Sequence, residues 1–200
     1  GNVSFYNESK NGSIPPSPIV SCLGKLNNVK KAIGMSFLSS DSSVVLVGRR
    51  KSEMGGSAYY HMKNNYDTDL PKPDLDEVKN QIYGLTDCID EKLIQSCHDI
   101  SDGGLGVALS EMSFENNIGC KISIDESLRH DEILFSETGG FIMEISDNNL
   151  KMVFNNFSKY GVELFTIGKT GGNNLIINDF LNVTVQEAKD AWDNGLNNKL

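Results

Sequence analysis

His98-Asp99-Ile100-Ser101-Asp102-Gly103-Gly104-Leu105 constrains the fold more than any other segment, because a polar, turn-rich run leads here directly into a helix. The helix is predicted over Leu105–Phe114, where Leu105, Leu109 and Met112 recur on one side. The two adjacent glycines before it allow the chain to turn sharply. The segment therefore indicates a turn that enters a helix packed by its apolar side.

Short apolar runs on both sides of this unit have the patterns of β-strands. They are β-branched or alternate apolar with polar residues, and turn residues bound them. Strands are predicted at Ile19–Leu23, Ser42–Gly48, Lys121–Asp125, Phe141–Ile145, Val162–Ile167 and Asn174–Asn178. The last two are expected to flank a turn at Gly171-Gly172.

A long helical region is predicted from Asp74, because apolar residues recur there at the spacing of one helical face. These residues are Leu75, Val78, Ile82 and Leu85. Gly84 interrupts the pattern, so a second helix is expected to follow it through Leu93-Ile94. Other helices are predicted from Gly55-Gly56-Ser57 to Met62, along the stripe of Leu150, Val153, Phe154 and Phe157 before Gly161, and from the capping box of Thr184 and Glu187 to Trp192.

The order of these elements mixes neighbouring strands with strand–helix–strand connections. This order predicts an α+β fold in which helices are layered on a mixed sheet. The 200 residues suffice for one sizeable core, or for one domain plus a piece of another. Because the chain starts at Gly1 without an initiator Met or a signal peptide, we expect it to be cut from a longer chain.

The charge balance argues against a nucleic-acid-binding protein. The chain has 18 basic and 27 acidic residues and a formal net charge of −9, whereas binding to a phosphate backbone depends on clustered Lys and Arg. A nucleotide can still bind if Mg²⁺ supplies positive charge locally. No apolar run approaches the roughly 20 residues of a membrane span, so no membrane partner is expected.

The four cysteines do not have the spacing of a metal site. Cys22, Cys88, Cys97 and Cys120 form no C-x-x-C pair and have no matching His. We therefore expect reduced, mostly buried thiols rather than a zinc site.

The first eight residues gather groups suited to binding a phosphorylated ligand. Asn2 offers a hard oxygen ligand for Mg²⁺, Ser4 can donate to a substrate or phosphate oxygen, and Gly1 lets a backbone approach a phosphate closely. The alternative interpretation is an edge strand followed by a polar loop.

The segment from His98 to Leu105 also carries candidate binding residues. Asp99 can hold Mg²⁺ and Ser101 can contact a nucleotide phosphate, close to a helix start where backbone N–H groups are free. The alternative is that Ser101 or Asp102 caps the helix and that His98 is structural. A Ser-His-Asp triad is disfavoured, because its members come together from separate parts of a fold.

Three segments occur together, in this order, in one family. Gly1–Glu8 resembles the G-N-V-S-L-Y-N-E signature of small-form phosphoribosylformylglycinamidine synthases, and Ile14–Val20 resembles the I-x-P-T-P-V-I segment that follows it. His98–Leu105, continued by Ala108–Met112, resembles the block H-D-x-S-D-G-G-L-x-x-A-L-x-E-M. The last block is shared in part with aminoimidazole ribonucleotide synthetase, selenophosphate synthetase and the hydrogenase-maturation dehydratase.

The resemblance implies an enzyme built from two pairs of PurM-like N- and C-terminal domains. Residues 1–38 would end the second, ATP-binding N-terminal domain, and residues 39–200 would form the second C-terminal domain. The implied reaction converts formylglycinamide ribonucleotide, ATP and ammonia to the amidine in purine biosynthesis. The implied partners are the missing N-terminal part of the same enzyme, a glutaminase subunit, PurQ, and a small PurS subunit. A cytoplasmic location and a homodimer of the chain are also expected.

Site residues follow from the resemblance position by position. Gly1 would contact ATP, Asn2 would ligate Mg²⁺ and Ser4 would contact the ribonucleotide. Asp99 and Ser101 match a metal ligand and a nucleotide contact of an auxiliary nucleotide site. Phosphoryl transfer depends on positioning and charge neutralisation, which these residue types provide.

The sequence also departs from the family pattern. The catalytic His and the main ATP-binding Lys of the family lie in the first pair of domains, so no catalytic residue is assigned and the chain is expected to be inactive alone. Ser136-Glu137-Thr138 departs from the substrate-binding E-S-Q pattern and takes no role. The alternatives are a stand-alone nucleotide-binding module that uses Asp99 and Ser101, or a related synthase such as selenophosphate synthetase.

Overall fold

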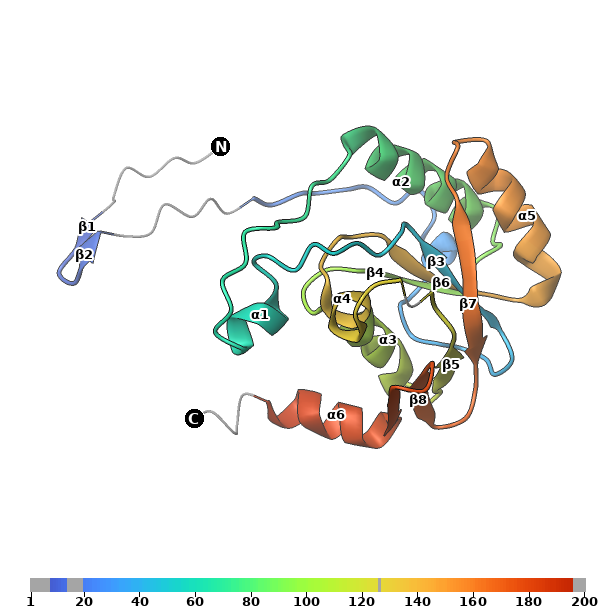
Figure 1. Ribbon diagram of the computed structural model, residues 1–200. Coiled ribbons are helices and arrows are strands. Elements are labelled where there is room, and N and C mark those ends of the chain that lie inside the picture. Colours follow the sequence, from blue (N-terminus) through green and yellow to red (C-terminus); the bar gives the residue numbers. More distant parts are fainter. Residues whose placement is uncertain (1–7, 14–19, 126, 196–200) are drawn as a thin grey trace.

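A seven-stranded mixed sheet forms the centre of the molecule. The computed structural model describes residues 8–13, 20–125 and 127–195, and within these ranges the sheet has the strand order β4-β6-β3-β7-β5-β8-β9 (Figure 1). β5 and β8 pair in parallel, and the other neighbours are antiparallel. The strands are β3 (Ser43–Val47), β4 (Ser96–Asp99), β5 (Cys120–Ile122), β6 (Phe141–Ile145), β7 (Leu164–Thr170), β8 (Asn174–Ile177) and β9 (Leu181–Thr184).

Helices cover both faces of this sheet, which confirms the predicted α+β fold. Figure 1 shows α2 and α5 on one side and α3, α4 and α6 on the other. The helices are α1 (Ala58–Met62), α2 (Leu75–Asp90), α3 (Gly104–Phe114), α4 (His130–Phe135), α5 (Asp147–Ser158) and α6 (Val185–Asn194). Before the sheet come a hairpin of β1 (Glu8–Ser9) and β2 (Gly12–Ser13) and a 3₁₀ turn, η1 (Val29–Lys31).

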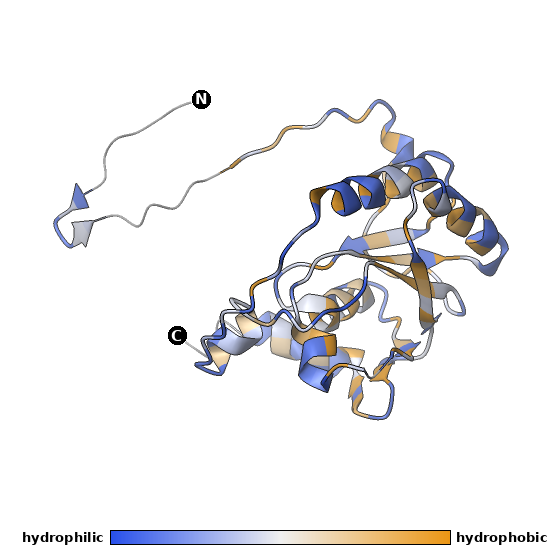
Figure 2. Ribbon diagram, turned by 45° about the horizontal axis from the view of Figure 1, so that its top comes forward, coloured by the Kyte–Doolittle hydropathy of each residue, from blue (hydrophilic) through white to orange (hydrophobic). Residues whose placement is uncertain are grey.

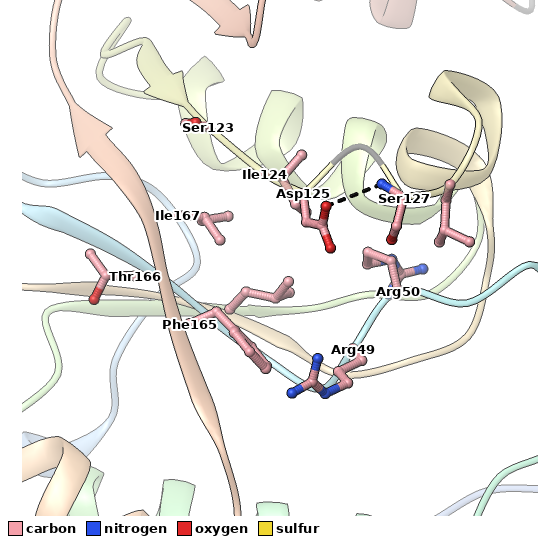
Figure 3. A pocket seen from close by; sticks show the side chains of 11 residues that line it. Arg49, Arg50, Ser123, Ile124, Asp125, Ser127, Phe165, Thr166 and Ile167 are labelled. Atoms are coloured by element: carbon pink, nitrogen blue, oxygen red, sulfur yellow. Dashed lines mark hydrogen bonds between the residues drawn. The ribbon is translucent and has the colours of Figure 1, made fainter.

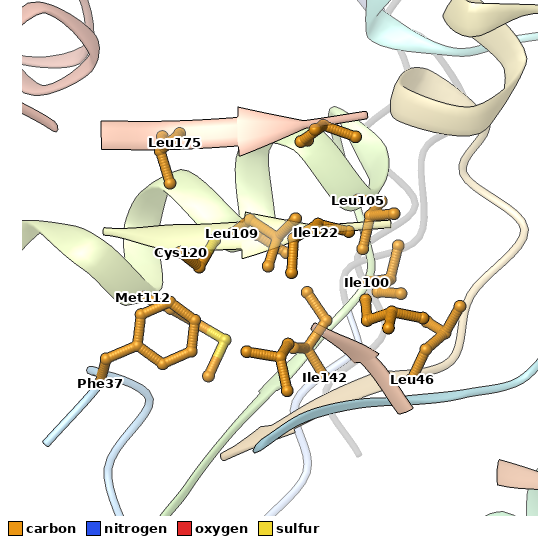
Figure 4. Packing of buried hydrophobic residues seen from close by; sticks show 14 of the residues in the cluster. Phe37, Leu46, Ile100, Leu105, Leu109, Met112, Cys120, Ile122, Ile142 and Leu175 are labelled. Atoms are coloured by element: carbon orange, nitrogen blue, oxygen red, sulfur yellow. The ribbon is translucent and has the colours of Figure 1, made fainter. Parts of the chain in front are cut away.

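β3 shows why the sheet is buried on both sides. Val44 and Leu46 pack into the cluster under α3, whereas Val45 and Val47 pack into the cluster under α2 and α5. Alternate residues of a strand point to opposite faces, so a strand covered on both sides reads as one unbroken apolar run. Figure 4 shows the first cluster, where Leu105, Leu109 and Met112 of α3 meet the sheet. Figure 2 shows the same distribution, with mainly hydrophobic strands and hydrophilic outer sides on α2 and α5.

The predicted break at Gly84 is wrong, because α2 runs through it without interruption. A Cβ at this position would lie 2.7 Å from Cδ1 of Phe157, so the glycine allows α2 to approach α5 closely. Leu93 and Ile94 belong to the turn after α2 rather than to a second helix. The predicted apolar stripe coincides with the buried face only at Leu85. That face consists of Gln81, Gly84, Leu85 and Cys88, whereas Leu75 and Ile82 remain 78% and 42% exposed.

The strand predictions need two corrections. Residues 20–23 form no strand, and Val20 and Leu23 are exposed because no neighbouring strand covers them. The two strands predicted around Gly171-Gly172 are confirmed as β7 and β8, although β5 lies between them in the sheet. His98 and Asp99 belong to β4, where they pair with β6, rather than to a turn.

The remaining element predictions agree with the structure to within a few residues. The helices beginning after Ser57, near Leu105 and at the capping box of Thr184 are confirmed. Of the stripe predicted for α5, Val153 and Phe157 are fully buried, but Phe154 is 36% exposed. α4 and β9 were not predicted, and β5 ends at Ile122 rather than at Asp125.

Candidate functional site

The end of β4 places Asp99 at the surface beside a partly buried histidine. The Asp99 side chain is 62% exposed, and its Oδ1 lies 3.2 Å from Nδ1 of His98. This contact has the distance of an ion pair but not the geometry of a hydrogen bond. Nε2 of His98 lies 3.0 Å from Oε2 of Glu111 on α3. His98 therefore lies between two carboxylates and ties the strand that carries Asp99 to α3.

The two glycines after Asp102 are required by the tight entry into α3. Gly103 and Gly104 have φ values of +82° and +69°, in the left-handed region that favours glycine. A Cβ on Gly104 would lie 2.6 Å from the carbonyl oxygen of Leu134, so α3 begins in close contact with the end of α4.

Gly103 itself is the N-cap of α3, and no side chain caps this helix. The alternative in which Ser101 or Asp102 caps the helix is therefore wrong. Ser101 and Asp102 are both exposed in the turn, so their side chains are available to a ligand.

A carboxylate from a distant part of the chain lies at this helix start. Oε1 of Glu137 accepts the N–H of Gly103 at 2.9 Å and the N–H of Ala58 at 2.8 Å. Glu137 thus joins the N-termini of α3 and α1, and the free N–H groups expected here are partly occupied. The sequence predicts no role for Glu137, and its one local signal for a site is that this carboxylate lies just before Gly139-Gly140.

Arg50 holds the loop that carries Glu137. Its Nη1 donates to the carbonyl oxygen of Gly139 at 2.9 Å, and its Nη2 donates to both the carbonyl oxygen and the Oγ of Ser136. Burial lowers the pKa of Arg50 to about 10, against the opposing effect of Glu53. The guanidinium remains charged at neutral pH and fixes the turn between α4 and β6.

A cavity of about 420 Å³ opens beside Glu137. Its lining brings together three stretches of the chain: residues 56–70 around α1, the turn before α3 and the loop after α4. The lining residues are Gly56, Ser57, Ala58, His61, Asn65, Tyr66, Asp67, Leu70, Asp102 and Glu137. Three of them are carboxylates and none is Lys or Arg, so an anionic ligand would need a cation with it. Neither Asp99, at the end of β4, nor Ser101, in the turn that follows, belongs to this lining.

The predicted metal and ligand contacts fall into two groups, those outside the described residues and those at and after the end of β4. Gly1, Asn2 and Ser4 lie outside the described residues. Within the described ranges, no group of three His, Cys, Asp or Glu side chains is close enough to hold a metal ion. Asp99 alone still fits a Mg²⁺ ligand, because Mg²⁺ commonly takes one or two protein carboxylates together with substrate phosphates and water.

Three of the four cysteines have the character of core residues. Cys88 and Cys120 are buried, Cys97 is partly buried and Cys22 is exposed, and all four are free thiols. Burial raises the pKa of Cys88 to about 11 and the pKa values of Cys97 and Cys120 to about 12. These three thiols are therefore protonated and unreactive at neutral pH. Among the helices that the structure describes, none is both long and apolar enough to cross a membrane.

Comparison with known proteins gives a consistent family assignment. Residues 40–177 match the family described as AIR synthase related protein, C-terminal domain. The chain is 31% identical to phosphoribosylformylglycinamidine synthase subunit PurL of Methanothrix thermoacetophila, with 98% of this chain and 26% of the relative covered. It is 36% identical to the same subunit of Thermoplasma volcanium, with the same coverage. The chain thus spans about a quarter of the length of these relatives.

Solved structures show the same fold at lower identity. The structure of T. maritima PurL complexed with FGAR matches with a TM-score of 0.70 and 15% identity over 80% of this chain and 30% of that chain. The structure of PurLQS from Thermotoga maritima matches with a TM-score of 0.63 and 17% identity over 79% of this chain and 27% of that chain.

Proposed function

The chain belongs to the family of AIR synthase related proteins, and from this membership we propose that it is the C-terminal part of a phosphoribosylformylglycinamidine synthase. The similarity to PurL subunits over 98% of the chain supports this assignment. So does the placement of the block that begins at His98, which forms a strand, a turn and a helix beside a cavity. The observation that carries the proposal is the exposed Asp99 at the end of β4, three residues before Asp102, which lines that acidic cavity.

In this proposal the chain helps to position Mg-ATP. Asp99 holds Mg²⁺ and Ser101 contacts the nucleotide, while Gly1, Asn2 and Ser4 contribute the ATP, metal and substrate contacts implied by their motif. Mg²⁺ supplies positive charge that neutralises the nucleotide phosphates. The described lining of the cavity beside Glu137 contains no Lys or Arg, and its carboxylates would repel a phosphate without a cation. This lining supports the need for Mg²⁺.

The whole enzyme would form the amidine in two steps. ATP transfers its γ-phosphoryl group to the amide oxygen of formylglycinamide ribonucleotide and leaves as ADP. Ammonia then attacks the carbon that carries this oxygen and displaces inorganic phosphate. We assign residues 1–38 to the end of an N-terminal domain and residues 39–200 to a C-terminal domain. The partners in this proposal are the remaining N-terminal part of the enzyme, the glutaminase subunit PurQ and the PurS subunit. The similarity to PurLQS of Thermotoga maritima supports these last two partners.

A chimera tests this function. The segment of Thermoplasma volcanium PurL that matches this chain is replaced by the chain, and formation of the amidine from ATP, ammonium and formylglycinamide ribonucleotide is measured. We expect product from the chimera and none from the chain alone. The Asp99→Ala chimera should lose at least about tenfold in activity, because a metal ligand is removed.

The matched control is Asp193→Ala, which removes an exposed carboxylate on α6 whose one ion pair among the described residues is with Lys189 at 3.4 Å. Its activity should equal that of the unmodified chimera. A chimera that folds, judged by circular dichroism and thermal unfolding, but makes no product would contradict the proposal. Product from the chain alone would contradict the claim that it needs the rest of the enzyme.

A further inference from the structure

A second cavity, of about 250 Å³, lies apart from the acidic one, between β3, β5 and β7 on the side of the sheet that α3 covers (Figure 3). Its floor is apolar. Leu46 and Ile167 are only 3% and 4% exposed, and the ring of Phe165 is partly buried beside them. A volume of this size and an apolar floor suit the hydrocarbon body of a small organic molecule.

One wall of this cavity is formed by the largely buried guanidinium of Arg50. Its two Nη atoms donate to neutral oxygens of Ser136 and Gly139, and its Nε is buried without an acceptor. Among the described residues, no carboxylate lies within ion-pair distance of Arg50. A buried cation without a paired carboxylate is costly, so an anion that enters the cavity gains an interaction that the protein itself does not satisfy.

A second guanidinium borders the same cavity. Arg49 lies over the Phe165 ring, with its Cζ 4.8 Å from the ring centroid, and its Nη2 pairs with Oε2 of Glu163 at 2.5 Å. Both contacts limit the freedom of this side chain, although it remains 66% exposed. The cavity therefore combines an apolar floor with a cationic wall and a cationic edge.

Asp125 limits the charge of the ligand. Its carboxylate also lines the cavity, and its Oδ1 accepts the N–H of Ser127 at 3.2 Å (Figure 3). A dianion such as a phosphate monoester would be repelled here, whereas a single carboxylate directed at Arg50 would be repelled less. The planar guanidinium is also well matched in shape to a carboxylate.

From these features we infer that this cavity binds a small organic carboxylate whose apolar body lies on Leu46, Phe165 and Ile167 and whose charge faces Arg50. The site is separate from the cavity beside Glu137 and does not depend on the proposed synthase function. The inference can therefore be tested independently of whether the chain binds Mg-ATP.

Fluorine NMR of the 200-residue chain tests this inference, with 4-fluorobenzoate as the probe and the uncharged 4-fluorobenzamide as its control. We expect 4-fluorobenzoate to bind. Loss of a charge-assisted hydrogen bond should weaken binding by about 10- to 100-fold, both for 4-fluorobenzamide and for the Arg50→Gln variant. Ser123→Phe, which places a ring in the cavity from an exposed lining position, should block the probe.

Lys51→Gln is the matched control, since Lys51 is a neighbouring exposed cation outside this lining and should leave binding unchanged. Arg50 also holds the loop after α4, so the Arg50→Gln variant can fail to fold. In that case the Ser123→Phe variant and the uncharged probe test the inference. No binding of 4-fluorobenzoate at millimolar concentration would overturn the inference. Equal binding of both probes, or unchanged binding by a folded Ser123→Phe variant, would overturn it as well.

Discussion

Glu144 is a fully buried carboxylate in the middle of an otherwise apolar strand. Its Oε2 accepts the N–H of Leu38 at 2.8 Å and the Oγ–H of Ser96 at 2.9 Å, and its Oε1 accepts the N–H of Ser39 at 2.9 Å. A buried charge is tolerated only when hydrogen bonds satisfy it in this way. Glu144 therefore fixes the segment that precedes β3 to the edge of the sheet formed by β6 and β4.

Glu144→Ala should destabilise the chain by about 2–4 kcal/mol, because three donors lose a charged acceptor. The midpoint and slope of urea unfolding measure this change. Glu163→Ala is the matched control, since Glu163 forms an exposed ion pair with Arg49 and should contribute about 0–1 kcal/mol. Equal unfolding midpoints for the two variants would show that Glu144 does not have this role.

The packing of α2 on α5 depends on Gly84, the glycine that was predicted to break the helix. Helical propensity alone favours Ala over Gly by about 1 kcal/mol in a helix interior. At Gly84, however, an added Cβ would lie 2.7–2.9 Å from three atoms of the Phe157 ring. The cost of overpacking therefore exceeds the gain in propensity.

Gly84→Ala should lower the free energy of unfolding by about 1–3 kcal/mol. Gly106→Ala on α3 is the matched control, because its Cβ would meet neighbours at ordinary distances of 3.5–3.6 Å. That variant should be neutral or more stable by up to about 1 kcal/mol. Thermal unfolding of both variants measures the difference, and a stabilised Gly84→Ala protein would contradict this explanation of the helix pair.

The elements that sequence patterns predicted well are those whose signals are local. β3, β6 and α3 are marked by their own apolar runs, and the start of α6 by the capping box of Thr184. The order of strands was not predictable from local signals. β5 lies between β7 and β8 in the sheet, although it precedes β7 by more than 40 residues in the chain. The spacing of apolar residues predicts Ile82 on the same helical face as Leu85, but in the folded chain Gln81 is buried and Ile82 is 42% exposed.

The candidate site depends on contacts that cross the whole molecule. Asp99 and Ser101 could be proposed as site residues from their motif, because the sequence carries it in one continuous block, and their roles stay predictions. The contacts of Glu137 could not be predicted from the sequence, since its partners Gly103 and Ala58 are 34 and 79 residues away along the chain. The chain spans about a quarter of its PurL relatives, so the complete site belongs to a larger assembly in our proposal. The homodimer implied by the resemblance stays a prediction.

Calorimetric titration of the chain with ATP in the presence of Mg²⁺ would show whether this half of the site binds nucleotide through Asp99. We expect binding that EDTA abolishes and that Asp99→Ala weakens at least about tenfold, while Asp193→Ala binds like the unmodified chain. Mg-ATP binding of equal strength in the Asp99→Ala variant would contradict the proposed role of Asp99. No heat of binding from the unmodified chain would contradict the expectation that this half of the site binds nucleotide without the rest of the enzyme.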